Sequence, residues 1–186
     1  MEQPVSDEDL MLRYRQGDAA AFADLYERHK GGLYRYILRK CINHAHADEL
    51  FQDVWVKLIA AKDRYEVRAR FTTWLYRMAH NHCVDYYRRQ STTIGNLQAG
   101  AIAADELAAR QSDQPEDGVE RQQQADRLLQ LLDGLPDEQR EAFVLHEEAG
   151  MGVAEIAEVT GVNPETAKSR LRYAVRKLRQ GLQSDG

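Results

Sequence analysis

Residues 153–180 read VAEIAEVTGVNPETAKSRLRYAVRKLRQ, and this stretch decides the fold of the C-terminal part of the chain. Gly161 stands where a tight turn needs a positive φ, which glycine adopts without strain. Asn163 and Pro164 then mark a helix start, because asparagine caps helices and proline fits their first position. Ala167 returns to the core one turn later. The stretch therefore predicts a helix-turn-helix.

The outward face of the second of these helices has an excess of cations, with a net charge of +5 within residues 164–180. A helix that enters the major groove reads base edges near its N-terminus and holds phosphates with flanking cations. The alternative is a solvated face of an ordinary helical bundle. The candidate base-edge residues are Lys168, Ser169, Arg172 and Tyr173, the candidate phosphate contacts are Arg170, Arg176, Lys177 and Arg179, and Thr166 shares the face.

A second basic segment, residues 64–90, has a net charge of +4 and interleaves aromatic rings with arginines. Aromatic rings stack on unpaired bases at roughly 1–3 kcal/mol per base, while arginines follow the backbone. This mixture favours single-stranded DNA over an intact duplex. The alternative is that the aromatic residues, which recur at helical spacing, belong to a core. The candidate DNA contacts are Tyr65, Arg68, Arg70, Phe71, Trp74, Arg77, Arg88 and Arg89.

The rest of the chain also favours helices, with start signals at Ser6 and Asp18 and an amphipathic stripe over residues 48–61. The pair Gly31-Gly32 indicates a weak point or bend in the second helix. We found no strand-like alternation and no repeat. The predicted fold class is all-α, with two small helical domains joined by a flexible linker. The expected bounds are 1–92 for the first domain, 93–122 for the linker, with one short helix near 105–110, and 123–186 for the helix-turn-helix domain.

Composition limits the class of protein. The net charge is −5, but the acidic excess is concentrated in residues 91–150, at −9, so two basic patches can still meet phosphates. No apolar run approaches the ~18–20 residues of a membrane span, and the acidic N-terminus is unlike a signal peptide. We therefore expect a soluble protein in the cytoplasm, without membrane insertion.

Motifs for catalysis or cofactors are not evident. The sequence has no phosphate-binding glycine loop, nucleophile elbow or zinc-protease motif, so we expect no enzyme and no cofactor. Cys41, His44 and His46 lie close together and leave a metal or redox role open, whereas His80 and His82 point to different faces of a helix. Our expectation is no metal. A conventional regulator that binds duplex DNA without polymerase is the nearest functional alternative.

Three segments in order carry a family resemblance: DELFQDVWVKL at 48–58, RFTTWLYRMAHNHCVDYYRRQ at 70–90 and LPDEQREAFVLHEEAGMGVAEIAEVTGVNPETAKSRLRYAVRKL at 135–178. This order resembles a bacterial RNA polymerase sigma factor of the small, two-domain extracytoplasmic-function type. The resemblance covers nearly the whole chain except the linker. It implies a transcription initiation factor that binds core RNA polymerase and directs it to promoters.

The resemblance also implies partners and roles. The C-terminal helix-turn-helix would read the −35 element as duplex, and the domain around it would dock on the β flap. The loop before Phe71, with Trp74 and Asn81, would capture the −10 element as a single strand. An anti-sigma protein is a further expected partner, and the protein would work at the nucleoid. The residues expected to dock on the coiled coil of the β′ clamp are Asp48, Glu49, Gln52, Asp53 and Trp55.

Overall fold

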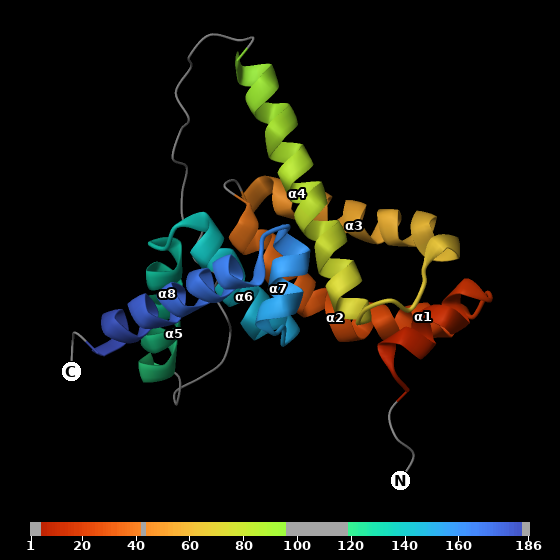
Figure 1. Cartoon of the computed structure of the whole chain (residues 1–186), viewed down its shortest axis with the longest axis horizontal. Coiled ribbons are helices and arrows are strands. Elements are labelled where there is room, and N and C mark those ends of the chain that lie inside the picture. The colour runs from red at the N-terminus through yellow and green to blue at the C-terminus, as the bar shows by residue number, and fades with distance from the viewer. Residues whose placement is uncertain (1–4, 42–43, 96–118, 184–186) are drawn as a thin grey trace.

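The computed structural model describes residues 5–41, 44–95 and 119–183, and these ranges contain helices and no strand (Figure 1). This confirms the all-α fold class. Within the described ranges no helix has the length and apolar character needed to cross a bilayer. The α-helices are α1 (Asp7–Arg15), α2 (Ala19–Lys40), α3 (Ala47–Ala61), α4 (Phe71–Gly95), α5 (Val119–Asp133), α6 (Asp137–Ala149), α7 (Val153–Thr160) and α8 (Pro164–Gln183), with 3₁₀ turns at His44–His46 and Lys62–Arg64.

Local signals set several helix starts. The hydroxyl of Ser6 accepts a hydrogen bond from the backbone N–H of Asp9 at the start of α1. The carboxylate of Asp18 accepts from two backbone N–H groups at the start of α2, which satisfies donors that have no partner inside the helix. The pKa of Asp18 is lowered, chiefly by a hydrogen bond from Arg13. These starts were predicted from the sequence.

Helices α1 to α4 form an N-terminal unit, and α5 to α8 form a C-terminal unit. In Figure 1, α2 lies beside α1, α3 and the first half of α4, and the second half of α4 projects away from the body. In the C-terminal unit, α8 crosses α6 and α7, and α5 packs on the later part of α8. A small second apolar cluster joins α5, α6 and α8, with Leu132, Leu135, Ala174 and Leu178 buried in it.

The two units also pack on each other, which the sequence did not suggest. One continuous apolar core contains Leu33 and Ile37 of α2 together with Ala142 and Leu145 of α6. Helix α6 lies against α2, and α7 lies against α4. The units are therefore in direct contact through apolar side chains.

The bend expected at Gly31-Gly32 does not form, because α2 continues without interruption to Lys40. Gly32 instead lies at a close approach between the units. A Cβ at this position would lie 2.9 Å from the hydroxyl of Tyr76 and 3.2 Å from the backbone carbonyl of Glu148. Glycine is needed here for contact between helices, not for a turn.

The expected bounds of the linker can be compared with the helices. Helix α4 continues to Gly95, and α5 begins at Val119, so both ends of the expected linker 93–122 are helical. No strong helix breaker precedes Gly95, which explains the longer α4. The short helix expected near 105–110 lies outside the described residues.

Candidate nucleic-acid interface

The turn between α7 and α8 has the geometry that the sequence predicts. Gly161 has φ 68°, in the left-handed region. The side-chain oxygen of Asn163 accepts a hydrogen bond of 2.8 Å from the backbone N–H of Thr166. Ala167 is completely buried, which allows α7 and α8 to cross closely.

The outward side of α8 is open to solvent. We call the exposed side chains of Lys168, Arg172, Tyr173 and Arg176 the recognition face. The Tyr173 ring is 41% exposed and lies between two guanidinium groups, 5.5 Å from that of Arg172 and 5.0 Å from that of Arg176. These distances favour cation–π attraction, which holds both arginines along the helix. Of the other predicted residues of α8, Lys177 is exposed, and Thr166, Ser169 and Arg170 are half-buried.

The predicted aromatic contacts of the N-terminal unit form a packed group around the start of α4. The ring centroids of Tyr65 and Trp74 are 5.0 Å apart, and those of Phe71 and Trp74 are 6.1 Å apart. Trp74 is half-buried, but Tyr65 is 2% exposed and Phe71 is 0% exposed. Tyr65 and Phe71 are therefore buried residues on which Trp74 packs. Their burial corrects the expectation that they contact DNA directly.

Helix α1 holds the loop that precedes α4. The guanidinium of Arg15 donates a 2.9 Å hydrogen bond to the carbonyl of Tyr65, at the start of the loop. A carboxylate oxygen of Glu8 accepts a 2.6 Å hydrogen bond from the backbone N–H of Phe71, at the end of the loop. Burial, with the negative charges of Glu8 and Asp7, raises the pKa of Tyr65 to about 12, so its hydroxyl stays protonated.

The predicted cations of this region fall into two sets. Arg70 and Arg77 contact the C-terminal unit, at 3.4 Å from Glu155 and 3.6 Å from Glu158 respectively. The other cations pair locally or lie on the projecting part of α4: Arg68 pairs with Glu66, Arg88 with Asp85, and Arg89 is exposed. Asn81 is exposed on α4. We call Arg68, Arg70, Trp74, Arg77 and Asn81 the strand patch.

The predicted polymerase-binding residues of α3 do not share one environment. Asp48, Glu49 and Gln52 are exposed, and half-buried Asp53 accepts from Nε2 of His82 at 3.0 Å when that nitrogen carries the proton. Trp55 is only 5% exposed. Its ring packs in a cluster with Phe22, Tyr26 and Phe51, so the structure corrects Trp55 from a contact residue to a buried support of α3.

Sequence reasoning missed an apolar residue on the outer face of α3. Val56 is 62% exposed and lies between exposed Gln52 and exposed Ile59 in the sequence. It falls outside the three- and four-residue spacing of the buried stripe, and this off-stripe position is the signal that could have found it.

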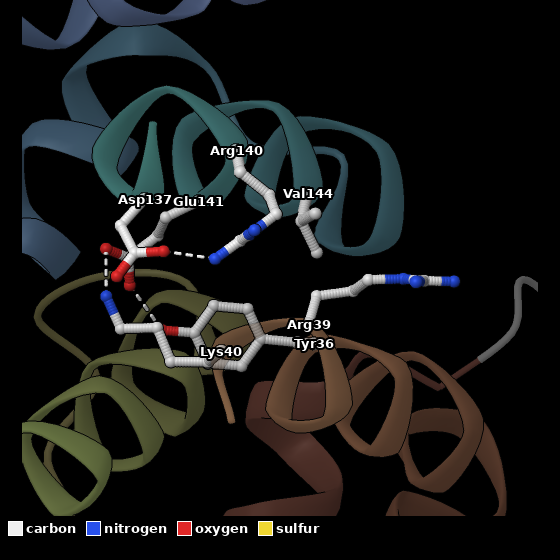
Figure 2. A pocket seen from close by; sticks show the side chains of 7 residues that line it. All are labelled: Tyr36, Arg39, Lys40, Asp137, Arg140, Glu141 and Val144. Atoms are coloured by element: carbon white, nitrogen blue, oxygen red, sulfur yellow. Dashed lines mark hydrogen bonds and ion pairs between the residues drawn. The ribbon is translucent and has the colours of Figure 1, made fainter. Parts of the chain in front are cut away.

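Sequence reasoning also missed Glu141 of α6, which is buried between the two units. Its carboxylate lies 2.7 Å from the hydroxyl of Tyr36 and 2.6 Å from Nζ of Lys40 (Figure 2), and 2.7 Å from Nδ1 of His80. Burial by itself raises the pKa of Glu141, but the hydrogen bond from His80 and the charge of Lys40 outweigh it and lower the pKa to about 2. Desolvation and the adjacent Glu141 charge raise the pKa of Tyr36, so its hydroxyl remains a donor. Glu141 is thus an ionised carboxylate held by three donors of the N-terminal unit.

The histidines and cysteines do not assemble into a metal site within the described part of the chain, which contains no suitable group of three or more ligands. His80 faces Glu141 and His82 faces Asp53, so the two histidines have separate partners. Cys41 and Cys83 are both buried free thiols. The side chain of His44 lies outside the described residues.

Comparison with protein families gives two matches in chain order. The family model described as Sigma-70 region 2 matches residues 25–93, and the one described as Sigma-70, region 4 matches residues 125–178. The chain is 32% identical over 170 residues to the RNA polymerase sigma factor CarQ of Myxococcus xanthus, covering 91% of this chain and 94% of that one. It is 27% identical over 178 residues to the ECF RNA polymerase sigma factor SigW of Bacillus subtilis, covering 90% and 92%.

Two solved structures share the fold. The sigma factor RpoE of Bartonella quintana, solved with the anti-sigma factor NepR, has a TM-score of 0.71 at 21% identity and covers 89% of this chain and 98% of that one. CnrH, solved with the cytosolic domain of CnrY, has a TM-score of 0.66 at 24% identity and covers 97% and 99%. Both comparisons support the same order of helices in two units.

Proposed function

Since the chain belongs to the extracytoplasmic-function family of RNA polymerase sigma factors, it binds core RNA polymerase and directs it to promoters, and we propose how its two units divide this task. The C-terminal unit reads the −35 element as duplex through the recognition face of α8. The N-terminal unit holds the −10 element as a single strand at the strand patch. The polymerase supplies the catalysis, and the chain itself is not an enzyme.

The observation that carries this proposal is that the cations of the two units have different neighbouring side chains. On α8, the cations surround one exposed ring on a helix that follows a tight turn, which suits the major groove. On α4, Arg77 shares a helix face with the half-buried Trp74 and the exposed Asn81 at three- and four-residue spacing, which suits an unstacked base. Extruding a base from the duplex costs a few kcal/mol, and stacking on Trp74 offsets part of that cost.

Polymerase docking is assigned to the outer face of α3. Exposed Asp48, Glu49 and Gln52, together with Val56, give this face an acidic rim and an apolar centre. This composition supports the β′ clamp coiled coil as the partner, and the C-terminal unit docks on the β flap. An anti-sigma protein is proposed as a further partner, because the RpoE of related fold was solved with one.

The proposed domain bounds stay at 1–92 and 123–186 with a linker at 93–122. The matches over residues 25–93 and 125–178 support this division. Core polymerase and promoter DNA occupy the bacterial cytoplasm, so we propose the nucleoid region as the site of action.

Reconstituted transcription tests the proposal. Core RNA polymerase is mixed with the purified chain and a library of genomic fragments, and the 5′ ends of the transcripts are sequenced. We expect start sites that share two spaced upstream elements and that require the chain. A chain that binds duplex DNA alone but does not program core polymerase would be a conventional regulator.

A charge reversal tests the docking face. Asp53→Lys places a cation on the outer face of α3 and is expected to abolish binding to core polymerase in a pull-down. Asp24→Lys makes the same charge change at an exposed position of α2 and serves as the matched control. Circular dichroism checks that both variants fold. Equal binding by the two variants would move the docking face elsewhere.

A further inference from the structure

Four glutamates of the C-terminal unit contact the N-terminal unit. Glu141 and Glu148 belong to α6, and Glu155 and Glu158 belong to α7. Their partners are side chains of α2, α4 and the loop before α4. Figure 1 shows α6 and α7 lying against these helices. The acidic side of one unit therefore faces the basic side of the other.

The contact at α2 combines an ion pair with a close approach of two backbones. Arg35 donates to both carboxylate oxygens of Glu148 at 2.7–2.9 Å. The backbone carbonyl of Glu148 approaches Gly32 so closely that no Cβ fits without a shift. Beside this contact, buried Glu141 is held by Tyr36 and Lys40 (Figure 2) and by His80. An ionised carboxylate without these donors would be costly to bury, so the three donors and the packed state depend on one another.

The contact at α4 pairs two cations of the strand patch with carboxylates of α7. Glu155 accepts from the hydroxyl of Thr73 at 3.1 Å and lies 3.4 Å from Arg70. Glu158 lies 3.6 Å from Arg77. These pairs are partly exposed and individually weak, so they are not what holds the units together. Their effect is to place two negative charges beside cations of the strand patch.

The other two functional surfaces stay open in the same arrangement. The recognition face on α8 is exposed, as are the acidic residues Asp48 and Glu49 on α3. The packing of the units thus places carboxylates at the strand patch and at neither of the other two surfaces. Polymerase and duplex DNA can reach the chain while single-stranded DNA meets Glu155 and Glu158.

We propose that the C-terminal unit is an intramolecular inhibitor of the strand patch, in which Glu155 and Glu158 occupy the positions of phosphates and Gly32 and Glu141 hold the closed state. This inference rests on the proposed function for the identity of the patch. Binding of single-stranded DNA then requires separation of the units. The apparent dissociation constant exceeds the intrinsic one by the reciprocal of the open fraction.

Two neighbouring glycines provide a matched test. Gly32→Ala weakens the contact between the units, because the added Cβ would lie 3.2 Å from the backbone carbonyl of Glu148, which would have to give by a few tenths of an ångström. Gly31→Ala makes the same chemical change, but its Cβ meets only Nη1 of Arg35 at 3.3 Å, and the hydrogen bonds to Glu148 come from the other two nitrogens of that guanidinium. Small-angle scattering of the full chain measures compactness. Fluorescence anisotropy with a random-sequence single-stranded 20-mer measures strand binding.

For Gly32→Ala we expect a larger radius of gyration and roughly tenfold tighter strand binding, while Gly31→Ala remains like the wild type. Expansion without a gain in strand binding would overturn the inhibitory role. A wild-type chain that is already expanded would overturn the closed state itself. Neither result depends on whether the chain programs core polymerase, so a failure of the proposed function remains distinguishable.

A second pair of variants covers the case in which Gly32→Ala does not fold. The double variant Glu155→Gln and Glu158→Gln removes both acidic groups from the strand patch. The double variant Glu138→Gln and Glu147→Gln removes the same charge from exposed positions of α6. Tighter strand binding by the first variant alone supports the proposal. Equal gains in both would show a general effect of net charge and contradict it.

Discussion

Glu8 of α1 caps α4, a helix that begins 63 positions later, because its carboxylate accepts a 2.6 Å hydrogen bond from the backbone N–H of Phe71. The start of a helix leaves backbone donors without partners, and a carboxylate there also opposes the positive end of the helix dipole. The cap of the helix that bears Trp74 and Asn81 therefore comes from outside the loop. This relation ties the first helix to the strand patch.

Glu8→Gln should lower the free energy of unfolding by about 1 kcal/mol, since an amide is a weaker acceptor than a carboxylate at a helix start. Urea unfolding followed by circular dichroism measures the change. Glu27→Gln is the control, because Glu27 makes only a pair with Lys30 on an exposed surface and should cost under roughly 0.5 kcal/mol. Equal losses of unfolding free energy in the two variants would contradict the role of Glu8 as a helix cap.

The stability of the chain should fall in acid because of Glu141. Its pKa is near 4.5 when unfolded and is lowered to about 2 in the packed state. A carboxyl with a lowered pKa stabilises the folded state fully above the unfolded value and loses this contribution as pH falls toward the folded value. The contribution lost between pH 4.5 and pH 2 is about 3 kcal/mol.

Chemical unfolding of the wild type and of Glu141→Gln at a series of pH values measures this. The variant should be less stable at neutral pH and should show a flatter dependence below pH 4.5. Glu147→Gln, at an exposed position of the same helix, should keep the wild-type profile. If Glu141→Gln lost stability below pH 4.5 as steeply as the wild type, the pH dependence would come from other carboxyl groups.

The ring of Tyr173 should matter for binding the −35 duplex through its two arginine neighbours. Tyr173→Phe keeps the cation–π contacts with Arg172 and Arg176, whereas Tyr173→Ala removes them and releases both side chains. We expect near-normal affinity for the first and a loss of about 1 kcal/mol for the second, measured on a −35 duplex once the transcript map defines it. Equal losses would indicate a direct role for the hydroxyl.

Arg172→Ala tests base reading on the same helix. We expect a cost of about 1–3 kcal/mol that is confined to particular positions of the −35 element, because a base-edge contact discriminates among bases. Competition binding with single-base variants of the duplex measures the pattern. A uniform loss over all sequences would reassign Arg172 to phosphate contact.

The cysteines should be unreactive in the folded chain. Burial, with smaller effects from Cys41 and Glu141, raises the pKa of Cys83 to about 12, and burial also raises the pKa of Cys41. A thiol must ionise before it attacks a disulfide reagent. At pH 8 both thiols should react slowly with Ellman's reagent, and both should react at once in urea. Rapid reaction of either in the folded chain would reopen a redox role.

Local signals made much of the fold predictable. The caps at Ser6, Asp18 and Asn163 and the positive φ at Gly161 follow from the chemistry of single residues and their near neighbours. The apolar stripe on α3, which includes Trp55, also predicted which side of that helix is buried, whereas the family resemblance made Trp55 a polymerase contact. Its ring is covered by side chains of α2, which are distant in sequence.

The packing of the two units could not be predicted in the same way. Glu141 and Glu148 occupy positions that look like a solvated face of α6, and their partners on α2 lie more than a hundred residues earlier in the chain. Gly32 suggested a bend because it belongs to a pair of glycines, and nothing in the neighbouring residues indicated its contact with α6. The cap from Glu8 escaped notice for the same reason. Periodicity and capping describe a helix and its near neighbours only.

The aromatic packing around α3 and α4 gives the protein a built-in optical probe. Trp55 and Trp74 are the two tryptophans of the chain, and both belong to the N-terminal unit. Trp55 is sealed by neighbouring rings, while Trp74 retains a solvent-facing edge beside Asn81. Selective excitation of indole therefore gives fluorescence from the N-terminal unit alone. A fall in tryptophan fluorescence upon addition of an oligonucleotide reports stacking at Trp74 without any label. Binding of duplex DNA at α8, which has no tryptophan, leaves this fluorescence unchanged.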